Sequence, residues 1–173
     1  TQMPHAWYGI FTRTPPISDE LSYIYHRNGF ALCSMRSSEL SRIYLQCDPD
    51  TQVEDWDDER FWSELFVRIG PEWAARFRPG PTLERTVVKL RSYVSAGMRV
   101  GNVFLAGDAA HIVPPSAAKG LNLAIGDVRR LGAALVRQLH GNDPGDLDRY
   151  SATSLRRVWA MQATRSSVPN KFM

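Results

Sequence analysis

Residues 100–122 read V-G-N-V-F-L-A-G-D-A-A-H-I-V-P-P-S-A-A-K-G-L-N, the most informative stretch of this sequence. Its apolar run, residues 103–106, is closed by Gly107 and Asp108, which is typical of a strand buried on both faces. Asp108 then lies at the carboxyl end of that strand, where α/β sheets place their ligands. The stretch therefore predicts a buried strand over residues 102–106, with an acidic side chain at a ligand-binding edge.

The second half of the stretch leads into a helix. Pro114 cannot be helical, because Pro115 pushes the residue before it toward extended backbone angles. Small residues then lead to Lys119 and Gly120, where a helical apolar pattern begins. The amino end of a helix offers unpaired N–H groups and a partial positive charge to an anion. This order favours a ligand-binding connection, although the residues alone also fit a connection that binds nothing.

The sequence pattern G-D-A-A-H-x-x-P-P-x-x-A-K-G-L-N resembles the flavin-contacting motif of the single-component FAD-dependent aromatic hydroxylases. The resemblance implies that Asp108 binds the ribityl hydroxyls of FAD. It also implies that the segment from the two prolines to Gly120, Leu121 and Asn122 lies against the isoalloxazine ring. One difference stands inside the motif: Ala117 replaces a glycine of the family, and a methyl group there leaves less room beside the flavin.

The composition is that of an ordinary globular protein. The chain has 173 residues, of which 43% are hydrophobic and 23% charged, enough for one domain or a small pair of lobes. A net charge of +3 is too small to favour nucleic acid as a partner. Cys33 and Cys47 lie in apolar surroundings without metal-type spacing, which favours reduced thiols in a cytoplasmic protein. No apolar run is long enough to span a bilayer and no signal peptide is visible, so we expect no membrane partner.

Apolar periodicity predicts an α+β fold. Residues 5–47 alternate like the strands of an antiparallel sheet, with Asn28-Gly29 as a hairpin turn. Residues 83–95 predict a long strand that returns to the same sheet. Helices are expected near residues 57–69, 119–139 and 147–163, with a short further helix over 72–77.

The resemblance extends to about Trp159 and covers only the middle of the family's length. No G-x-G-x-x-G turn, which grips the FAD pyrophosphate in this family, follows a strand in this sequence. We therefore expect a fragment of an α/β family member: a mixed, mainly antiparallel substrate-domain sheet, then the flavin-contacting strand-loop-helix and long helices. The expected domains are a substrate-binding domain, residues 1–99, and the remnant of a flavin-binding domain, residues 100–173.

Ser34 and Arg36 are two positions apart in a predicted strand, so their side chains leave the same face. A hydroxyl beside a guanidinium suits a carboxylate, because arginine offers a planar fork of donors. Tyr44 on the next strand could add a phenol, and Tyr23 points in from the partner strand. On pattern alone, a surface arginine in an ion pair and two packed tyrosines are the more common arrangement.

The resemblance assigns roles to these residues, because F-A-L-C-S-x-R and S-R-x-Y match the substrate strands of hydroxylases that act on 4-hydroxybenzoate. It implies that the carboxylate is bound by Ser34, Arg36 and Tyr44, with Met35 between the clamp residues. It implies that Tyr23 is the catalytic residue, which binds the phenol oxygen and helps to remove its proton. A phenolate is a better nucleophile than a phenol toward an electrophilic oxygen. The backbone carbonyl of Pro115 lies near the same oxygen, and Arg42 and Arg91 match basic positions associated with the flavin or with NADPH.

Two functions remain open from the sequence. The first is a flavin-dependent hydroxylase that converts 4-hydroxybenzoate to 3,4-dihydroxybenzoate with FAD, NADPH and O₂. The second is a truncated, inactive paralogue that binds an aromatic acid or a partner chain. Because the missing lobe should leave a large apolar surface exposed, we expect a homo-oligomer or association with that lobe.

Overall fold

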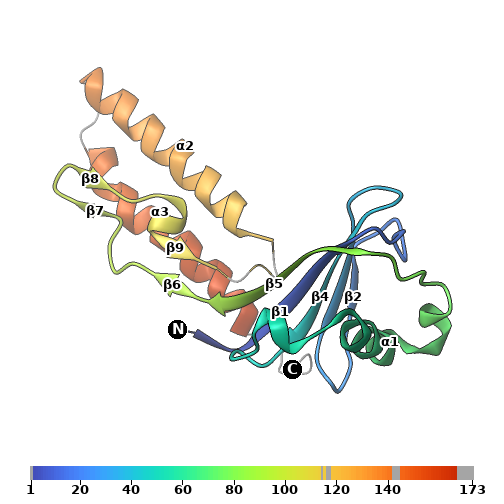
Figure 1. Cartoon of the computed structure of the whole chain (residues 1–173). Helices are drawn as coiled ribbons and strands as arrows, with labels where there is room; N and C mark the ends of the chain where they lie inside the picture. The colour runs from blue at the N-terminus through green and yellow to red at the C-terminus, as the bar shows by residue number, and fades with distance from the viewer. Residues whose placement is uncertain (1, 114, 116–117, 142–144, 167–173) are drawn as a thin grey trace. The chain divides into compact units, whose positions relative to one another are not determined.

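In a computed structural model of the chain, residues 2–113, 115, 118–141 and 145–166 are described, with side chains up to residue 162. They form two compact units, Gln2–Leu90 and Arg91–Lys171, which Figure 1 traces along the chain. The expected division lay between residues 99 and 100. The structure divides the chain earlier because the predicted strand over residues 83–95 is interrupted.

The amino-terminal unit is built on a five-stranded sheet with the order β2-β3-β4-β1-β5. β1 pairs antiparallel with β4, β4 with β3, and β3 with β2. This confirms the antiparallel sheet expected over residues 5–47. The turn between β2 and β3 contains Gly29 at φ 106°, a left-handed angle that glycine adopts without steric cost. The strands are β1 (Gln2–Thr12), β2 (Ser22–Ile24), β3 (Ala31–Met35), β4 (Ser41–Cys47) and β5 (Thr82–Arg91).

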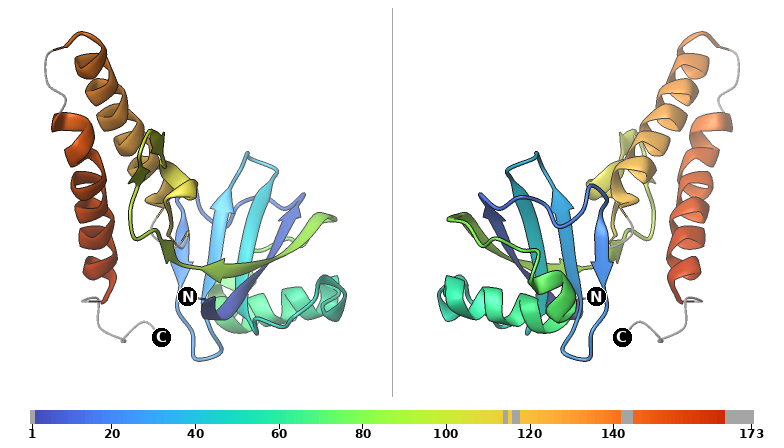
Figure 2. Two further views of the ribbon diagram at one scale, coloured as in Figure 1. Left: turned by 90° about the vertical axis from the view of Figure 1, so that its left-hand side faces the viewer. Right: turned by 90° about the vertical axis from the view of Figure 1, so that its right-hand side faces the viewer.

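Helix α1 (Asp58–Ala74) covers one face of this sheet (Figures 1 and 2). It follows the short helix η1 (Val53–Asp55) and begins at Asp57, whose carboxylate accepts a hydrogen bond of 2.8 Å from the Arg60 N–H. Its helical angles are broken at Gly70, as the Gly-Pro pair predicted. The apolar residues of α1 pack against the side chains of one sheet face: Phe61, Trp62, Leu65 and Ile69 against Tyr8, Ile10, Ala31, Cys33, Ile43 and Leu45.

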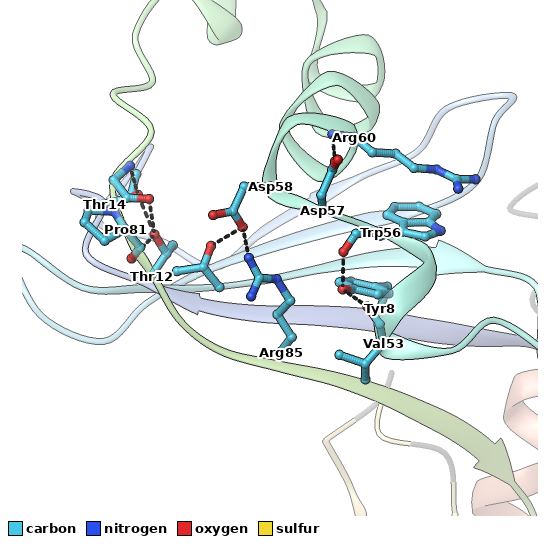
Figure 3. Close-up of polar contacts among 12 residues, drawn as sticks. Tyr8, Thr12, Thr14, Val53, Trp56, Asp57, Asp58, Arg60, Pro81 and Arg85 are labelled. Atoms are coloured by element: carbon cyan, nitrogen blue, oxygen red, sulfur yellow. Dashed lines mark hydrogen bonds and ion pairs between the residues drawn. The ribbon is translucent and has the colours of Figure 1, made fainter.

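Buried hydroxyls tie the connections of this unit to β1 (Figure 3). The Tyr8 hydroxyl lies 2.8 Å from the Val53 carbonyl and 2.9 Å from the Trp56 carbonyl. At the other end of β1, the Thr12 and Thr14 hydroxyls lie 2.9 Å apart, and Thr12 also donates to the loop before β5. Both threonines are fully buried. The sheet edge and the loop before β5 are therefore held by specific hydrogen bonds as well as by packing.

The carboxyl-terminal unit consists of two small strand pairs and two long helices. β6 (Tyr93–Val94) pairs with β9 (His111–Ile112), and β7 (Arg99–Val100) pairs with β8 (Val103–Phe104). The helices α2 (Gly120–Leu139) and α3 (Gly145–Ser166) lie side by side in every view (Figures 1 and 2). Their bounds lie close to the predicted ones. A small core of Met98, Ala110 and Tyr150 holds the strands to the helices.

Of the two strand predictions for this part of the chain, one is largely confirmed and one is wrong. The long strand expected over residues 83–95 returns to the sheet as β5 (Thr82–Arg91), beside β1, and ends before Ser92, after which β6 pairs with β9. The strand expected to be buried over residues 102–106 is the two-residue β8, whose Val103 is 65% exposed. Gly101, at φ 58°, turns the chain back into a β7–β8 hairpin. An apolar run shows that residues suit a strand, but it does not show what covers them.

The apolar stripe that predicted α2 is largely exposed within the described part of this unit. Leu121, Val128 and Leu139 are 72%, 62% and 81% exposed. The face buried instead carries Leu123, Asp127 and Ala134. Periodicity located the helix correctly and indicated the wrong buried face. Within the described residues, none of the helices is long and apolar enough to span a bilayer.

Candidate functional site

The predicted substrate residues share one face of the five-stranded sheet. Tyr23 lies opposite Leu32, and Leu32 lies opposite Tyr44 on the next strand. Ser34 lies opposite Arg42 two positions further along the same strands. Directly opposed residues and residues two apart point to the same side of a sheet. This is the side away from α1, and we call it the substrate face.

Aromatic rings form the floor of the substrate face. Trp7 stacks on Phe30 with ring centroids 5.3 Å apart and lies 5.6 Å from the ring of Tyr44. Tyr23 lies 5.7 Å from Phe30 and is 50% exposed. Trp7 is buried together with Leu32. The face therefore offers an apolar floor for an aromatic ring, with an exposed phenol at its β2 edge.

Arginines lie at the polar end of this face. Arg36 is exposed one residue beyond β3, and within the described part of the chain its guanidinium has no ion-pair partner. Arg42 is partly neutralised, because it lies 3.2 Å from a carboxylate oxygen of Glu84 and is placed over the ring of Phe11. Its Nη1 is also 3.5 Å from the Tyr44 hydroxyl. Arg36 is therefore the cation of this face that is free to bind an anion.

Met35 and Gly9 depart from the sequence-based expectation. Met35 lies opposite Ser41 in the register, on the α1 side, so only its main chain lies between Ser34 and Arg36. Gly9 was not predicted to belong to the site, yet a Cβ there would lie 2.5 Å from Cε1 of Tyr44. Glycine inside a strand is a known sign of such a close approach, and that signal was available in the sequence.

Asp108 lies in the carboxyl-terminal unit, on the short helix η2 (Gly107–Ala109), and its side chain is exposed. Gly107 is buried at φ 60°, and a Cβ there would be 3.1 Å from the Cβ of Ala124 on α2. Just before it, the Leu105 carbonyl accepts a 2.7 Å hydrogen bond from the Tyr150 hydroxyl. Burial raises the pKa of Tyr150 to about 12, so it remains a donor at neutral pH. The backbone is fixed while the Asp108 carboxylate faces solvent.

His111 makes a buried polar contact instead of serving as an isolated packing residue. Its Nε2 lies 2.6 Å from Oδ2 of Asp127 on α2, and the two side chains are 1% and 2% exposed. The same oxygen accepts a hydrogen bond of 3.2 Å from the Gly107 N–H. Sequence reasoning missed Asp127. The sequence did contain a signal for it, because Asp127 is the only acidic residue of α2 and lies four residues after the buried Leu123.

The start of α2 presents backbone donors. The Leu123 N–H is bonded to the Lys119 carbonyl at 3.0 Å, so the N–H groups of Gly120, Leu121 and Asn122 precede the intrahelical ladder. Among the described residues no side chain caps this end, and the first turn carries no acidic residue. These backbone donors and the exposed Asp108 acceptor fit a ligand such as FAD, which presents ring oxygens and nitrogens as well as sugar-alcohol hydroxyls.

Other predicted positions are less informative. The Pro115 carbonyl accepts a 2.9 Å hydrogen bond from the Ala118 N–H and keeps one free lone pair. Ala118 adopts φ 48°, an uncommon angle for a residue with a side chain. Ala117 lies outside the described residues. Arg91 is exposed as the last residue of β5.

A cavity of about 560 Å³ lies between α2 and α3. Arg130 and Arg157 both approach Gly126, since a Cβ at that glycine would be 3.4 Å and 2.2 Å from their Nη1 atoms. Burial and the charge of Arg157 lower the pKa of Arg130. The predicted cofactor residue Asn122 also lines the cavity, so the helix start borders a positively charged groove.

The family of FAD-binding domains matches residues 1–165, and the chain belongs to that family. It is 48% identical over 157 residues to a p-hydroxybenzoate hydroxylase of Acinetobacter baylyi, covering 90% of this chain and 39% of the relative. It is 35% identical over 128 residues to a 3-(3-hydroxy-phenyl)propionate/3-hydroxycinnamic acid hydroxylase of Mycolicibacterium smegmatis, covering 70% of this chain and 21% of the relative. The chain thus spans less than half the length of these relatives.

Solved structures of monooxygenases share the fold. The p-nitrophenol 4-monooxygenase of Pseudomonas putida superposes with a TM-score of 0.69 at 22% identity, covering 89% of this chain and 40% of that chain. An aklavinone-11 hydroxylase, solved with FAD and aklavinone, gives a TM-score of 0.67 at 23% identity, covering 86% of this chain and 29% of that chain. These neighbours, together with the mixed helices and antiparallel sheet, confirm the expected fold class.

Proposed function

We propose that this chain is the substrate-binding and flavin-contacting part of a hydroxylase that converts 4-hydroxybenzoate to 3,4-dihydroxybenzoate with FAD, NADPH and O₂. The observation that carries the proposal is the shared face of Tyr23, Ser34 and Tyr44, with the unpaired Arg36 at its end. The 48% identity to a p-hydroxybenzoate hydroxylase supports the choice of substrate.

The substrate carboxylate binds at the Arg36 end. A guanidinium matches a carboxylate with two parallel N–H donors, and the Ser34 and Tyr44 hydroxyls add further donors. The ring then lies on the apolar floor that Trp7 and Phe30 form. Tyr23 binds the phenol oxygen and takes up its proton while its own hydroxyl proton passes to solvent on its exposed side, so that the ring becomes a phenolate of higher electron density. Because Tyr23, Ser34 and Tyr44 come from paired strands and Arg36 directly follows β3, the sheet sets their spacing before the substrate arrives.

The flavin side is assigned to the carboxyl-terminal unit. Asp108 binds the ribityl hydroxyls, and the N–H groups of Gly120, Leu121 and Asn122 donate to the ring edge. Bound FAD would supply the redox chemistry, in which electrons from NADPH reduce O₂ so that one of its oxygen atoms enters the ring and the other leaves as water. Arg91 is the better of the two basic residues for NADPH, because Arg42 would first have to leave Glu84.

Tryptophan fluorescence during titration with 4-hydroxybenzoate tests this proposal, since Trp7 lies in the floor. Arg36→Ala should weaken binding by about tenfold or more, because a charged hydrogen bond contributes roughly 1.5–3 kcal/mol. Arg36→Lys should retain part of the affinity, since it keeps the charge and loses the fork. Arg76→Ala, at an exposed arginine two residues after the end of α1, is the matched control. Equal affinity in the parent and Arg36→Ala would remove the substrate assignment.

The chemistry of the clamp also fits 4-aminobenzoate, which carries the same carboxylate. Competition between the two acids in the titration ranks them. An inactive paralogue that binds an aromatic acid shares the clamp and differs only in turnover. NADPH oxidation coupled to dihydroxybenzoate formation by the complete protein separates these two functions.

Association with further polypeptide, either a second copy or a longer lobe, is also proposed. The exposed stripe of α2, including Leu121, Val128 and Leu139, supports it, because monomeric proteins seldom leave such a continuous apolar patch in water. Light scattering during gel filtration tests it. A monodisperse 19.5 kDa species over a wide concentration range would contradict self-association.

A further inference from the structure

The carboxylate of Asp127 binds both ends of the loop that carries Asp108. One oxygen, Oδ2, accepts from the Gly107 N–H at 3.2 Å and lies 2.6 Å from Nε2 of His111. Gly107 and His111 are the first and last residues of the segment G-D-A-A-H. The other oxygen, Oδ1, is 3.9 Å from Nη1 of Arg130. A single side chain of α2 therefore connects the two ends of a five-residue segment.

The segment is closely bound on its inner side and open on its outer side. Asp127 is 1% exposed and His111 is 1% exposed, whereas Asp108 between them is exposed. Within the segment, the Ala110 N–H donates to the Gly107 carbonyl at 2.9 Å. On the strand side, β9 carries His111 and is paired through Val94 of β6. The loop thus has fixed ends and an outward carboxylate.

A carboxylate is well suited to this position. The Gly107 N–H donates to one oxygen, which also lies against Nε2 of His111, and the second oxygen faces the guanidinium of Arg130. An amide could accept with its oxygen, but its NH₂ group would then point toward Arg130. A buried acceptor without partners is unfavourable, and here the partners are supplied by the loop itself.

We propose that Asp127 is a positioning residue, which fixes the Gly107–His111 loop and thereby sets the direction in which Asp108 meets FAD. This inference rests on the proposed function, since it takes Asp108 as the residue that binds the flavin hydroxyls. Asp127 itself is buried under the loop and touches neither flavin nor substrate. Nothing in the family match or in the named relatives assigns it a role.

Amide hydrogen exchange and amide NMR spectra of the 173-residue chain test the proposal without any flavin. In Asp127→Ala, exchange of the Gly107–His111 amides should accelerate about tenfold or more, while the β3 and β4 amides change by less than about twofold. The Asp108 amide should give a single resonance in the parent and a broadened or split one in Asp127→Ala. Asp127→Asn should lie between the two, since it restores one acceptor.

Asp148→Asn is the matched control, because Asp148 is an acid of α3 whose ion pair with Arg99, at 2.5 Å, lies on the surface. It should leave loop exchange and the Asp108 resonance unchanged. If Asp127→Ala does not fold, Asp127→Asn decides the question by the same two measurements. The positioning role would be overturned if the loop amides of Asp127→Asn exchanged as slowly as those of the parent. It would also be overturned if the exchange rates rose equally across α2, α3 and the loop.

The two proposals fail separately. Unchanged loop exchange would remove the role of Asp127 and leave the benzoate titration unaffected, because that titration reports on residues of the amino-terminal unit. A chain that does not bind 4-hydroxybenzoate would remove the substrate assignment, and the exchange result for the Gly107–His111 loop would still stand.

Discussion

Gly9 shows how one missing side chain shapes the substrate face. Its strand position lies directly opposite Tyr44, and the Tyr44 ring occupies the space that a Cβ would need, 2.5 Å from Cε1. A methyl group at this point must push the ring away, because such a contact is far inside van der Waals distance. The placement of Tyr44 in the proposed carboxylate clamp therefore depends on a residue that has no side chain.

Gly9→Ala should lower the affinity for 4-hydroxybenzoate and destabilise the fold by about 1–3 kcal/mol, the usual cost of overpacking. Titration and urea unfolding measure the two effects. Gly132→Ala on α2 is the control, because nothing lies within 4 Å of its added methyl group. Unchanged affinity in Gly9→Ala would mean that Tyr44 is not placed by this contact.

Cys33 illustrates how burial suppresses chemistry at a single residue. Burial raises the pKa of its thiol to about 12, so on the order of one molecule in ten thousand carries the thiolate at pH 8. We expect no alkylation of Cys33 by iodoacetamide in the folded chain and slow alkylation of the half-buried Cys47, whose pKa burial also raises. Mass spectrometry with and without denaturant measures this. Rapid labelling of Cys33 in the native protein would contradict it.

At the scale of elements, the loop between α1 and β5 is fitted closely to the end of β1. The Gly80 N–H donates to the Thr14 hydroxyl at 2.9 Å, and the Arg13 N–H donates to the Pro81 carbonyl at 3.0 Å. A Cβ at Gly80 would lie 1.8 Å from the Arg13 carbonyl oxygen. Because that atom belongs to the backbone, it cannot move aside as a flexible side chain would.

Gly80→Ala should therefore lower the free energy of unfolding by at least the roughly 1–3 kcal/mol typical of overpacking. Urea denaturation followed by circular dichroism gives the value. Gly97→Ala, where the nearest atom is 3.9 Å from the added methyl group, should change stability far less. Similar values for the two variants would show that the loop before β5 adapts more readily than its hydrogen bonds suggest.

The junction of α2 and α3 should respond to acid through Asp146. Hydrogen bonds from Arg149, at 2.7 Å, and from Arg137 lower the pKa of Asp146 below its ordinary value of 3.8. A carboxyl with a lowered pKa in the folded state stabilises the fold above its ordinary pKa, and this contribution disappears as pH falls through the folded value. The carboxylate therefore contributes to stability at neutral pH.

As pH is lowered below about 4, the free energy of unfolding of the parent should fall more steeply than that of Asp146→Asn, because only the parent takes up a proton there on unfolding. Parallel urea titrations between neutral pH and pH 3 measure the difference. Identical pH slopes for the two proteins would show that the arginine contacts do not persist in solution.

Viewed as a whole molecule, the chain shows what a linear pattern can and cannot predict. Alternation placed Ser34 and Arg36 on one face, because a strand has a period of two residues. Helical periodicity found α2 but not its buried face, since Leu121 and Val128 have no cover among the described residues. The contact of Asp127 with its loop depends on the fold, which brings together residues far apart in sequence.

FAD retention depends on the sum of the flavin contacts that the whole polypeptide can make. In the described residues, the proposed flavin contacts are the Asp108 carboxylate and the backbone N–H groups at the start of α2. The carboxylate contributes roughly 1.5–3 kcal/mol, and a helix amino end contributes up to about 2 kcal/mol. Micromolar binding requires about 8 kcal/mol. These contacts alone are too weak to retain the cofactor.

We therefore expect the 173-residue polypeptide to lose added FAD during gel filtration and to show no NADPH oxidation coupled to dihydroxybenzoate formation. Absorbance of the protein peak near the flavin bands measures retention, and the full-length Acinetobacter baylyi relative, of which this chain spans 39%, serves as the positive control. Asp108→Ala should leave the result unchanged if the parent already fails to retain flavin. A yellow parent protein that carries equimolar FAD, and loses it in Asp108→Ala, would contradict the expectation. Such a result would show that a few contacts on a preformed loop are enough to retain FAD. The rigid backbone around Gly107 would then remove most of the ordering cost of binding.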